Sequence, residues 1–152
     1  MHALDTETGE EQFAFVPGEL LKNHYEFYSN DTSFERPYGL DGPLSVWRDD
    51  ANDNLIVDAG DSAFLFVGMR RGGNSFYALD VSNPDNPKLA WTITGGENGS
   101  AGFESMGQSW SRLTPVKMFI NGSEKDVLIF GGGYDTVQDL SLIHISEPTR
   151  PY

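Results

Sequence analysis

A short unit recurs along the chain and constrains its fold more than any other feature. The tripeptide Ala-Leu-Asp occurs at residues 3–5 and again at residues 78–80. After the first copy, Asp5 and Gly9 are typical of a tight turn, and residues 12–16 alternate polar and apolar side chains as a strand does. The second copy ends one strand-like run, and residues 89–93 form the next. Repeated strand-turn-strand units predict an all-β protein of antiparallel meanders, in a propeller or a related solenoid.

Both units resemble the tryptophan-docking motif of quinoprotein-type propellers, Ala-x-Asp-x-x-Thr-Gly-x-x-x-Trp. The first copy keeps Ala3, Asp5, Thr8 and Gly9, with Phe13 in place of tryptophan. The second keeps Ala78, Asp80 and Trp91, but it has an insertion and lacks Thr-Gly. In that family the large aromatic residue stacks between adjacent blades. Phe13 and Trp91 are therefore expected to be buried core residues and not cofactor ligands.

An acidic stretch, residues 50–61, lies between two strand-like runs. Oxygen-bearing side chains occupy its relative positions 1, 3, 5, 9 and 12, which is the ligand spacing of an EF-hand-type calcium loop. Position 7 of such a loop supplies a backbone carbonyl. The candidate metal ligands are Asp50, Asn52, Asn54, the carbonyl of Ile56, Asp58 and Asp61.

Two residues depart from the EF-hand pattern. Leu55 stands where the EF-hand has glycine, and Asp61 stands where it has a bidentate glutamate. The flanking runs also favour strands over helices, so a loop closing at Asp58 and one closing at Asp61 both remain open. The alternative is an ordinary solvated turn, since Asp and Asn favour turns in any case. Without an ion, we expect a mobile loop with loosely registered flanking strands.

Composition excludes several classes of function. The net charge of −13 argues against binding to nucleic acids or to anionic membrane surfaces, because both need clustered Lys and Arg. Seventeen glycines and eight prolines favour a turn-rich β protein, and we expect less than about a tenth of the chain in helices, well below the usual third. The chain has no cysteine and therefore no disulfide framework.

The rest of the chain shows strands and loops. Residues 64–69, 75–79, 111–119 and 126–130 favour strands, and Asn121-Gly122 is typical of a hairpin turn. Residues 16–23 favour a turn and one short helical turn, and residues 24–45 favour an irregular segment whose aromatic side chains either pack onto the sheet or form a recognition surface. Arg70 and Arg71 are the strongest positive cluster, and we expect them in a solvated hairpin turn.

The two ends of the sequence differ from its body. Residues 140–152 resemble the translated read-through of a sequencing adapter, so we expect a non-native tail that makes no packed contacts. Met1 leads directly into a repeat unit. We therefore expect residues 1–139 to be part of a longer propeller domain.

Several motifs together resemble the C-terminal β-propeller of the PilY family of type IV pilus biogenesis factors and tip-associated adhesins. The match covers about residues 1–139, which would be about two to three blades of a quinoprotein-alcohol-dehydrogenase-like propeller. The motifs are residues 16–21, 68–81, 107–112 and 127–135 together with the acidic loop.

The resemblance implies a non-enzymatic protein with a single Ca²⁺ site and no quinone cofactor. The family pattern maps onto Asp50, Asn52, Asn54, Ile56 and Asp58, and leaves Asp61 as an optional extra ligand. It also implies that calcium occupancy controls whether pili extend or retract. The implied partners are minor pilins and a host surface, and the implied location is the bacterial pilus tip, associated with the outer membrane or secreted through the periplasm, without direct membrane insertion.

Two other classes of function remain open. One is a fragment of a quinone (PQQ)-dependent dehydrogenase, which would use the same docking motif. Such enzymes need an Asp base and often a vicinal Cys pair, and this chain has no cysteine and no recognisable nucleophile-base pair. The other is a generic carbohydrate- or protein-binding propeller with a structural calcium ion.

Overall fold

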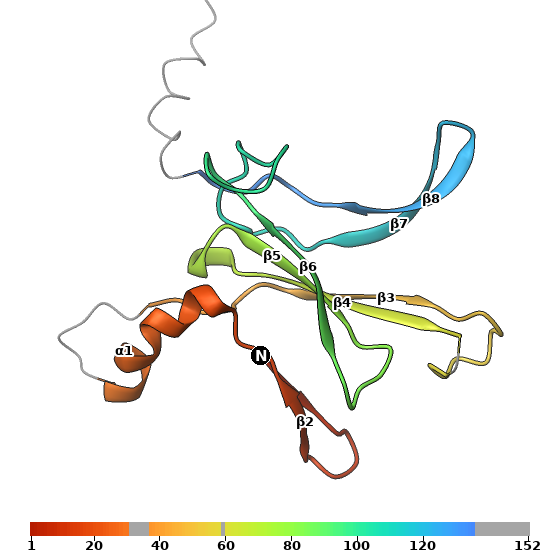
Figure 1. The fold of residues 1–152 in the computed structure, drawn as a ribbon, viewed down its shortest axis with the longest axis horizontal. Helices are drawn as coiled ribbons and strands as arrows, with labels where there is room; N and C mark the ends of the chain where they lie inside the picture. The colour runs from red at the N-terminus through yellow and green to blue at the C-terminus, as the bar shows by residue number, and fades with distance from the viewer. Residues whose placement is uncertain (31–36, 59, 136–152) are drawn as a thin grey trace, which may run out of the picture.

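The computed structural model describes residues 1–30, 37–58 and 60–135, and within these ranges the fold is built from antiparallel sheets (Figure 1). A two-stranded sheet, a four-stranded sheet and a second two-stranded sheet follow one another along the chain. The prediction of an all-β fold with antiparallel meanders is confirmed. The predicted non-native tail, residues 140–152, lies outside the described residues.

The first sheet is a hairpin of β1 (His2–Leu4) and β2 (Glu11–Ala14). Asp5 Oδ1 accepts hydrogen bonds from the backbone N–H groups of Glu7 and Thr8, and Gly9 takes a φ of 75° that closes the turn. Ala3 pairs with Phe13, so the docking motif has its alanine and its aromatic residue side by side. Phe13 is half-buried here, not fully buried as predicted.

The second sheet is a complete meander in the order β3-β4-β5-β6. Its strands are β3 (Leu44–Asp49), β4 (Ser62–Gly68), β5 (Ser75–Asp80) and β6 (Lys88–Thr94). β3 and β4 pair in unbroken register from Leu44 opposite Val67 to Asp49 opposite Ser62. The two strands on either side of the acidic loop are thus paired along their whole length.

A helical segment lies between the first two sheets, where an irregular chain was predicted from residue 24 onward. A 3₁₀ helix, η1 (Gly18–Asn23), leads into α1 (His24–Ser29), which ends at Asn30 with a left-handed φ of 48°. Among the aromatic residues here, Tyr25 and Tyr28 are 72% and 90% exposed, so they do not pack onto the sheet. No helix in the described ranges is long and apolar enough to cross a membrane.

The third sheet is the hairpin of β7 (Thr114–Ile120) and β8 (Ser123–Ile129). Asn121 and Gly122 form its turn, both with positive φ, as the Asn-Gly pair predicts. A short 3₁₀ turn, η2 (Arg70–Gly72), joins β4 to β5 and replaces the predicted hairpin turn.

The core lies on both faces of β4 and β5, because successive side chains of a strand point to opposite faces. Val67 and Tyr77 pack on one face with Leu20 and Met69. Phe66 and Phe76 pack on the other face, which the β7–β8 hairpin partly covers. That cluster also contains Ala78, Met106 and Leu113, with half-buried Trp47, Phe64, Trp91, Ile93, Phe103, Leu128 and Phe130 around them.

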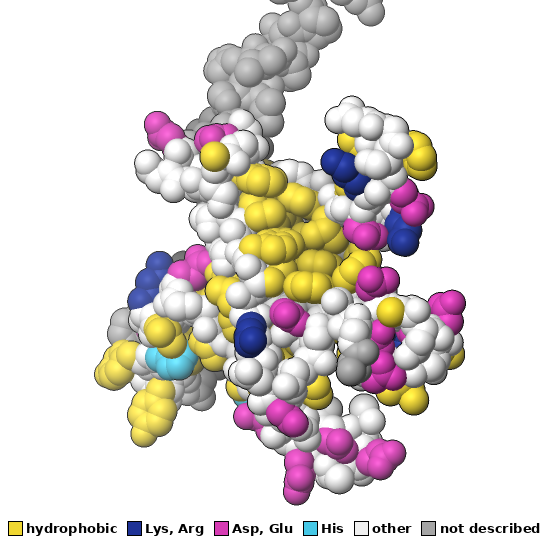
Figure 2. All heavy atoms as spheres, turned by 45° about the vertical axis from the view of Figure 1, so that its right-hand side comes forward, with side chains coloured by type: hydrophobic (Ala, Val, Ile, Leu, Met, Phe, Trp, Pro, Cys, Tyr) yellow, Lys and Arg dark blue, Asp and Glu magenta, His cyan; other side chains and the backbone are white. Residues whose placement is uncertain are grey.

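An apolar groove of about 330 Å³ remains between the four-stranded sheet and the β7–β8 hairpin. Figure 2 shows apolar side chains gathered in one continuous surface at this place. Trp91 lines the groove and stacks on Phe66 with ring centroids 5.8 Å apart. It is half-buried, so the prediction of a buried Trp91 holds only in part.

Candidate functional site

The acidic loop joins β3 to β4 and projects from one end of the four-stranded sheet. Asp50 organises its first half through both carboxylate oxygens. Oδ1 accepts the N–H of Asn54 at 3.2 Å, and Oδ2 accepts the N–H of Leu55 at 2.8 Å. The side chain of Asp50 is only 9% exposed, so the chain coils around this carboxylate.

Three predicted ligands meet on one side of the loop. Asn54 Nδ2 donates to Asp58 Oδ2 at 2.8 Å, and Asn52 Nδ2 lies 3.4 Å from each Asp58 oxygen. The two amide oxygens also accept backbone N–H groups, from Asn54 at 3.1 Å and from Ile56 at 2.7 Å. The loop therefore brings side chains at positions 3, 5 and 9 together, around a first-position carboxylate.

Asp61 has a different place in the loop. Its Oδ1 accepts the N–H of Ala51 at 2.9 Å and its Oδ2 accepts the N–H of Asp58 at 2.9 Å, so it joins the two ends of the loop. These two hydrogen bonds hold the pKa of the Asp61 carboxyl below its usual value, and the bond from the Asp58 N–H has the larger effect. Asp61 is buried and acts as a brace at the neck of the loop.

Leu55 replaces the expected glycine and still makes the turn. Its φ is 66°, in the left-handed region that glycine adopts without strain, and Asp53 has a φ of 55°. A leucine in this conformation costs about 1–2 kcal/mol. The hydrogen bond from Leu55 N–H to Asp50 helps to hold the strained turn, so the departure at position 6 does not stop the loop from coiling.

Arg48 takes part in the loop from strand β3, although no sequence motif indicated it. Its Nη1 donates to the carbonyl of Leu55 at 3.0 Å, and its Nη2 lies 3.6 Å from Asp50 Oδ2. The sequence shows that Arg48 lies two residues before Asp50. It does not show that the loop coils so that the carbonyl of Leu55 reaches the Arg48 guanidinium. Arg48 thus supplies positive charge next to the first ligand of the candidate metal site.

The candidate ligands offer the oxygen atoms that a hard cation binds, but few of these ligands carry a negative charge. Carboxylate, amide and carbonyl oxygens are the ligands that Ca²⁺ takes. Only Asp50 and Asp58 are carboxylates among the core positions, and the described residues contain no group of three or more His, Cys, Asp or Glu side chains placed to hold a metal ion. The site would therefore depend on neutral amide oxygens for much of its coordination.

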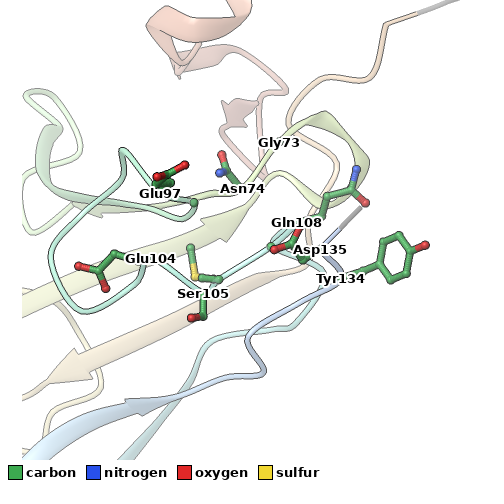
Figure 3. A pocket seen from close by; sticks show the side chains of 11 residues that line it. Gly73, Asn74, Glu97, Glu104, Ser105, Gln108, Tyr134 and Asp135 are labelled. Carbon is green, nitrogen blue, oxygen red and sulfur yellow. The ribbon is translucent and has the colours of Figure 1, made fainter. Parts of the chain in front are cut away.

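A second, polar hollow of about 580 Å³ lies near the other end of the sheet (Figure 3). It lies between Gly73 and Asn74, which directly precede β5, the loop after β6, and the bridge that pairs Gln108 with Tyr134. Three carboxylates line it, those of Glu97, Glu104 and Asp135. No motif in the sequence predicted this hollow, because its walls come from segments far apart in the chain.

Comparison with known proteins identifies the family. No family profile matches the chain. It is 34% identical over 143 residues to a "Type IV pilus biogenesis factor PilY1 homolog" of Xylella fastidiosa, across 94% of this chain. It is also 28% identical to the "Type IV pilus biogenesis factor PilY1" of Pseudomonas aeruginosa PAO1, across 95% of the chain. The chain spans only 11% of the length of each of these relatives.

The fold gives the same result. The crystal structure of the Pseudomonas aeruginosa PilY1 C-terminal domain superposes on 88% of this chain with a TM-score of 0.57 and 28% sequence identity, and the match covers 23% of that domain. Sequence and structure thus agree over nearly the whole chain, and the chain belongs to the PilY family.

Proposed function

We propose that this chain is a calcium-binding, non-enzymatic part of the β-propeller of a type IV pilus biogenesis factor. In this proposal β3–β6 is one complete blade, and the two hairpins belong to its neighbours on either side. The apolar faces of β4 and β5 suit such stacking, since each packs against residues from a different flanking segment. The names of the relatives support the pilus role.

The convergence of Asn52, Asn54 and Asp58 is the observation that supports the metal site most directly. The amide nitrogens of Asn52 and Asn54 lie 3.4 Å and 2.8 Å from Asp58 oxygens, and two backbone N–H groups fix Asp50 in the same loop. A loop that coils in this way already has most of its ligands close together. Bound calcium would add positive charge beside Asp58, whereas Asp50 already has the Arg48 guanidinium 3.6 Å away.

In this proposal each residue has a separate task. Asp50, Asn52, Asn54 and Asp58 supply side-chain oxygens and Ile56 supplies its carbonyl, so the loop closes at Asp58. Asp61 holds the neck of the loop, because its two oxygens join the loop's two ends at Ala51 and Asp58, and it is at most an optional extra ligand. With two carboxylate ligands we expect a dissociation constant of roughly 10⁻⁶ to 10⁻³ M, in the range of sensor and extracellular sites.

The functional consequence that we propose is control of pilus extension and retraction by calcium. Ligand binding to the folded form alone stabilises that form by mass action. A loop that is held more firmly when calcium is present would change how this end of the blade meets minor pilins or a host surface. These partners, and the location at the pilus tip, belong to the proposal.

The test compares two substitutions of equal charge in the same loop. Asp58→Asn removes a proposed ligand charge, whereas Asp53→Asn changes an exposed residue whose left-handed φ asparagine tolerates well. Calcium should raise the unfolding temperature of the wild type and of Asp53→Asn, and should have much less effect on Asp58→Asn. Equal calcium shifts in all three proteins would show that the loop is an ordinary acidic turn.

A further inference from the structure

The end of the blade opposite the acidic loop has an arginine-aromatic cluster made of Arg70, Arg71, Trp110 and Tyr38. The loop after β3 and the turn after β4 lie at opposite ends of an antiparallel meander, so the proposed calcium site and this cluster are far apart. We propose that the cluster binds a carboxylate-bearing segment of a protein partner, that is, an acidic peptide. This proposal does not depend on calcium binding.

Both guanidinium groups stack on the same indole ring. The Cζ atoms of Arg70 and Arg71 lie 4.9 Å and 5.6 Å from the ring centroid of Trp110. Arg71 also lies 5.3 Å from the Tyr38 ring and donates from Nη1 to the Tyr38 hydroxyl at 2.8 Å. Stacking of this kind fixes the guanidinium planes while leaving other N–H donors at their edges. The solvated turn expected from the sequence is thus an ordered cluster.

The two arginines differ in their acidic neighbours. Arg70 Nη1 lies 3.6 Å from Asp41 Oδ2, an exposed pair. Arg71 is exposed, and no described carboxylate lies within 4.0 Å of its guanidinium. The chain has a net charge of −13, and among the described residues Arg70 and Arg71 are two adjacent cations with one ion pair to a carboxylate, that of Arg70 with Asp41. A guanidinium without a carboxylate partner is suited to a bidentate bond with one.

The backbone beneath the cluster is rigid and strained. Arg70 has a left-handed φ of 50°, which is unfavourable for a residue other than glycine, and its N–H donates to the carbonyl of Ser109 at 3.2 Å. Ser109 directly precedes Trp110, so one contact fixes the turn and the indole relative to each other. Strain of this kind is found where a function needs a side chain in a set place.

Tyr38 is held in place by a close backbone approach. A Cβ atom on Gly72 would lie 1.9 Å from the carbonyl oxygen of Gly39, so only glycine allows the turn to meet this segment. Three segments that are far apart in sequence thus present four side chains at one surface. An arrangement fixed in advance loses less entropy when it binds a ligand.

The charge of the whole chain decides between classes of ligand. A polyanion such as an acidic polysaccharide carries many negative charges and extends over a long stretch of the protein surface. Because the rest of that surface is acidic, it repels the polyanion. A short peptide with one or two carboxylates can bind the two arginines while it extends over less of that acidic surface. The aromatic rings flank the guanidiniums and can contact the aliphatic parts of such a peptide. An acidic peptide is therefore the ligand that the cluster fits best.

The experiment measures binding of an end-capped synthetic octapeptide of Gly with Glu at two positions to the full chain by calorimetry, beside the matched peptide with Gln at those two positions. We expect saturable binding of the Glu peptide that weakens with added salt, and no binding of the Gln peptide. Arg71→Gln should weaken binding by roughly tenfold or more. Lys125→Gln, an equal charge change at an exposed site in β8, should leave the affinity unchanged.

Two further variants separate binding from misfolding. Arg71→Lys keeps the charge but loses the planar fork, so its affinity should fall between those of the wild type and Arg71→Gln. Asp41→Asn frees Arg70 from its own carboxylate and should tighten binding, which a folding defect does not do. The proposal is overturned if the Gln peptide binds equally well, if neither peptide binds, or if Arg71→Gln and Lys125→Gln behave alike. Tighter binding of hyaluronan than of the Glu peptide would assign the cluster to an acidic polysaccharide instead.

Discussion

The hydroxyl of Ser109 accepts a hydrogen bond from the backbone N–H of Met69 at 2.8 Å, across forty residues of sequence. The same hydroxyl donates to the carbonyl of Ser75 at 2.8 Å, and Ser109 is fully buried. One side chain therefore joins the end of β4, the start of β5 and the segment that leads to β7. This contact ties the β7–β8 hairpin to the central sheet.

Replacing Ser109 by alanine should destabilise the protein. The change leaves the N–H of Met69 and the carbonyl of Ser75 buried without this partner, and an unsatisfied buried group costs about 1–3 kcal/mol. Urea unfolding followed by tryptophan fluorescence measures the loss. Ser123→Ala, at an exposed hydroxyl in the β7–β8 hairpin, is the control and should change stability by less than about 0.5 kcal/mol. Equal effects of the two changes would refute the role given to Ser109.

Gly42 should not tolerate alanine. Its N–H donates to the carbonyl of Gly68 at 2.9 Å, and a Cβ atom here would lie 2.1 Å from that same oxygen. The backbone must shift to relieve the clash, at a cost of about 1–3 kcal/mol. Gly132→Ala is the control, because nothing lies within 4 Å of the position of its Cβ. Thermal unfolding of both variants should show a clear loss only for Gly42→Ala.

Local patterns in the sequence predicted much of the fold. The Asn121-Gly122 turn and the strands around it follow from turn chemistry and alternation, and the turn residues Asp5 and Gly9 predicted the first strand-turn-strand unit. Helix α1 was not predicted, because its Ncap residue makes no side-chain hydrogen bond and no residue of the helix is buried. Asn23 is a residue type that favours helix N-caps, but one such residue without a periodic apolar face does not distinguish a helix from a turn.

The candidate sites were predicted less completely than the fold. Spacing alone located the acidic loop, since its ligands are close in sequence. Spacing did not show that Asp61 would bond to the neck of the loop or that Arg48 would reach Leu55, because both depend on how the backbone coils. The arginine-aromatic cluster joins residues 38, 70, 71 and 110, and no local pattern connects positions so far apart.

The lowered pKa of Asp61 predicts a pH dependence of stability. A carboxyl whose pKa is lower in the folded state than in the unfolded state stabilises the protein above the unfolded value, which is near 3.8. That contribution is lost as the pH falls through the lower, folded-state pKa. Asp61→Asn does not titrate, so its deficit in unfolding temperature relative to the wild type should be constant at neutral pH and should shrink below about pH 4.

Asp53→Asn is the control for this measurement. Asp53 lies in the same loop and is exposed, and its substitution keeps both backbone hydrogen bonds of Asp61. Other carboxyls with lowered pKa, such as Asp5 and Asp80, are common to all three proteins and cancel in the comparison. A deficit for Asp61→Asn that stays constant down to pH 2 would contradict the link between its two backbone hydrogen bonds and stability.

Asp50→Ala should have two separable effects, because Asp50 both shapes the loop and is a proposed ligand. Without calcium, the N–H groups of Asn54 and Leu55 lose their acceptor and Arg48 loses its nearby carboxylate, so the unfolding temperature should fall. With calcium, the wild type should gain about 2.7 kcal/mol when the free ion is at a hundred times its dissociation constant, and Asp50→Ala should gain almost nothing. Asp53→Ala should keep the full gain. Calcium titration during thermal unfolding measures both effects, and a variant that is destabilised but still gains the full calcium shift would show that Asp50 shapes the loop without binding the ion.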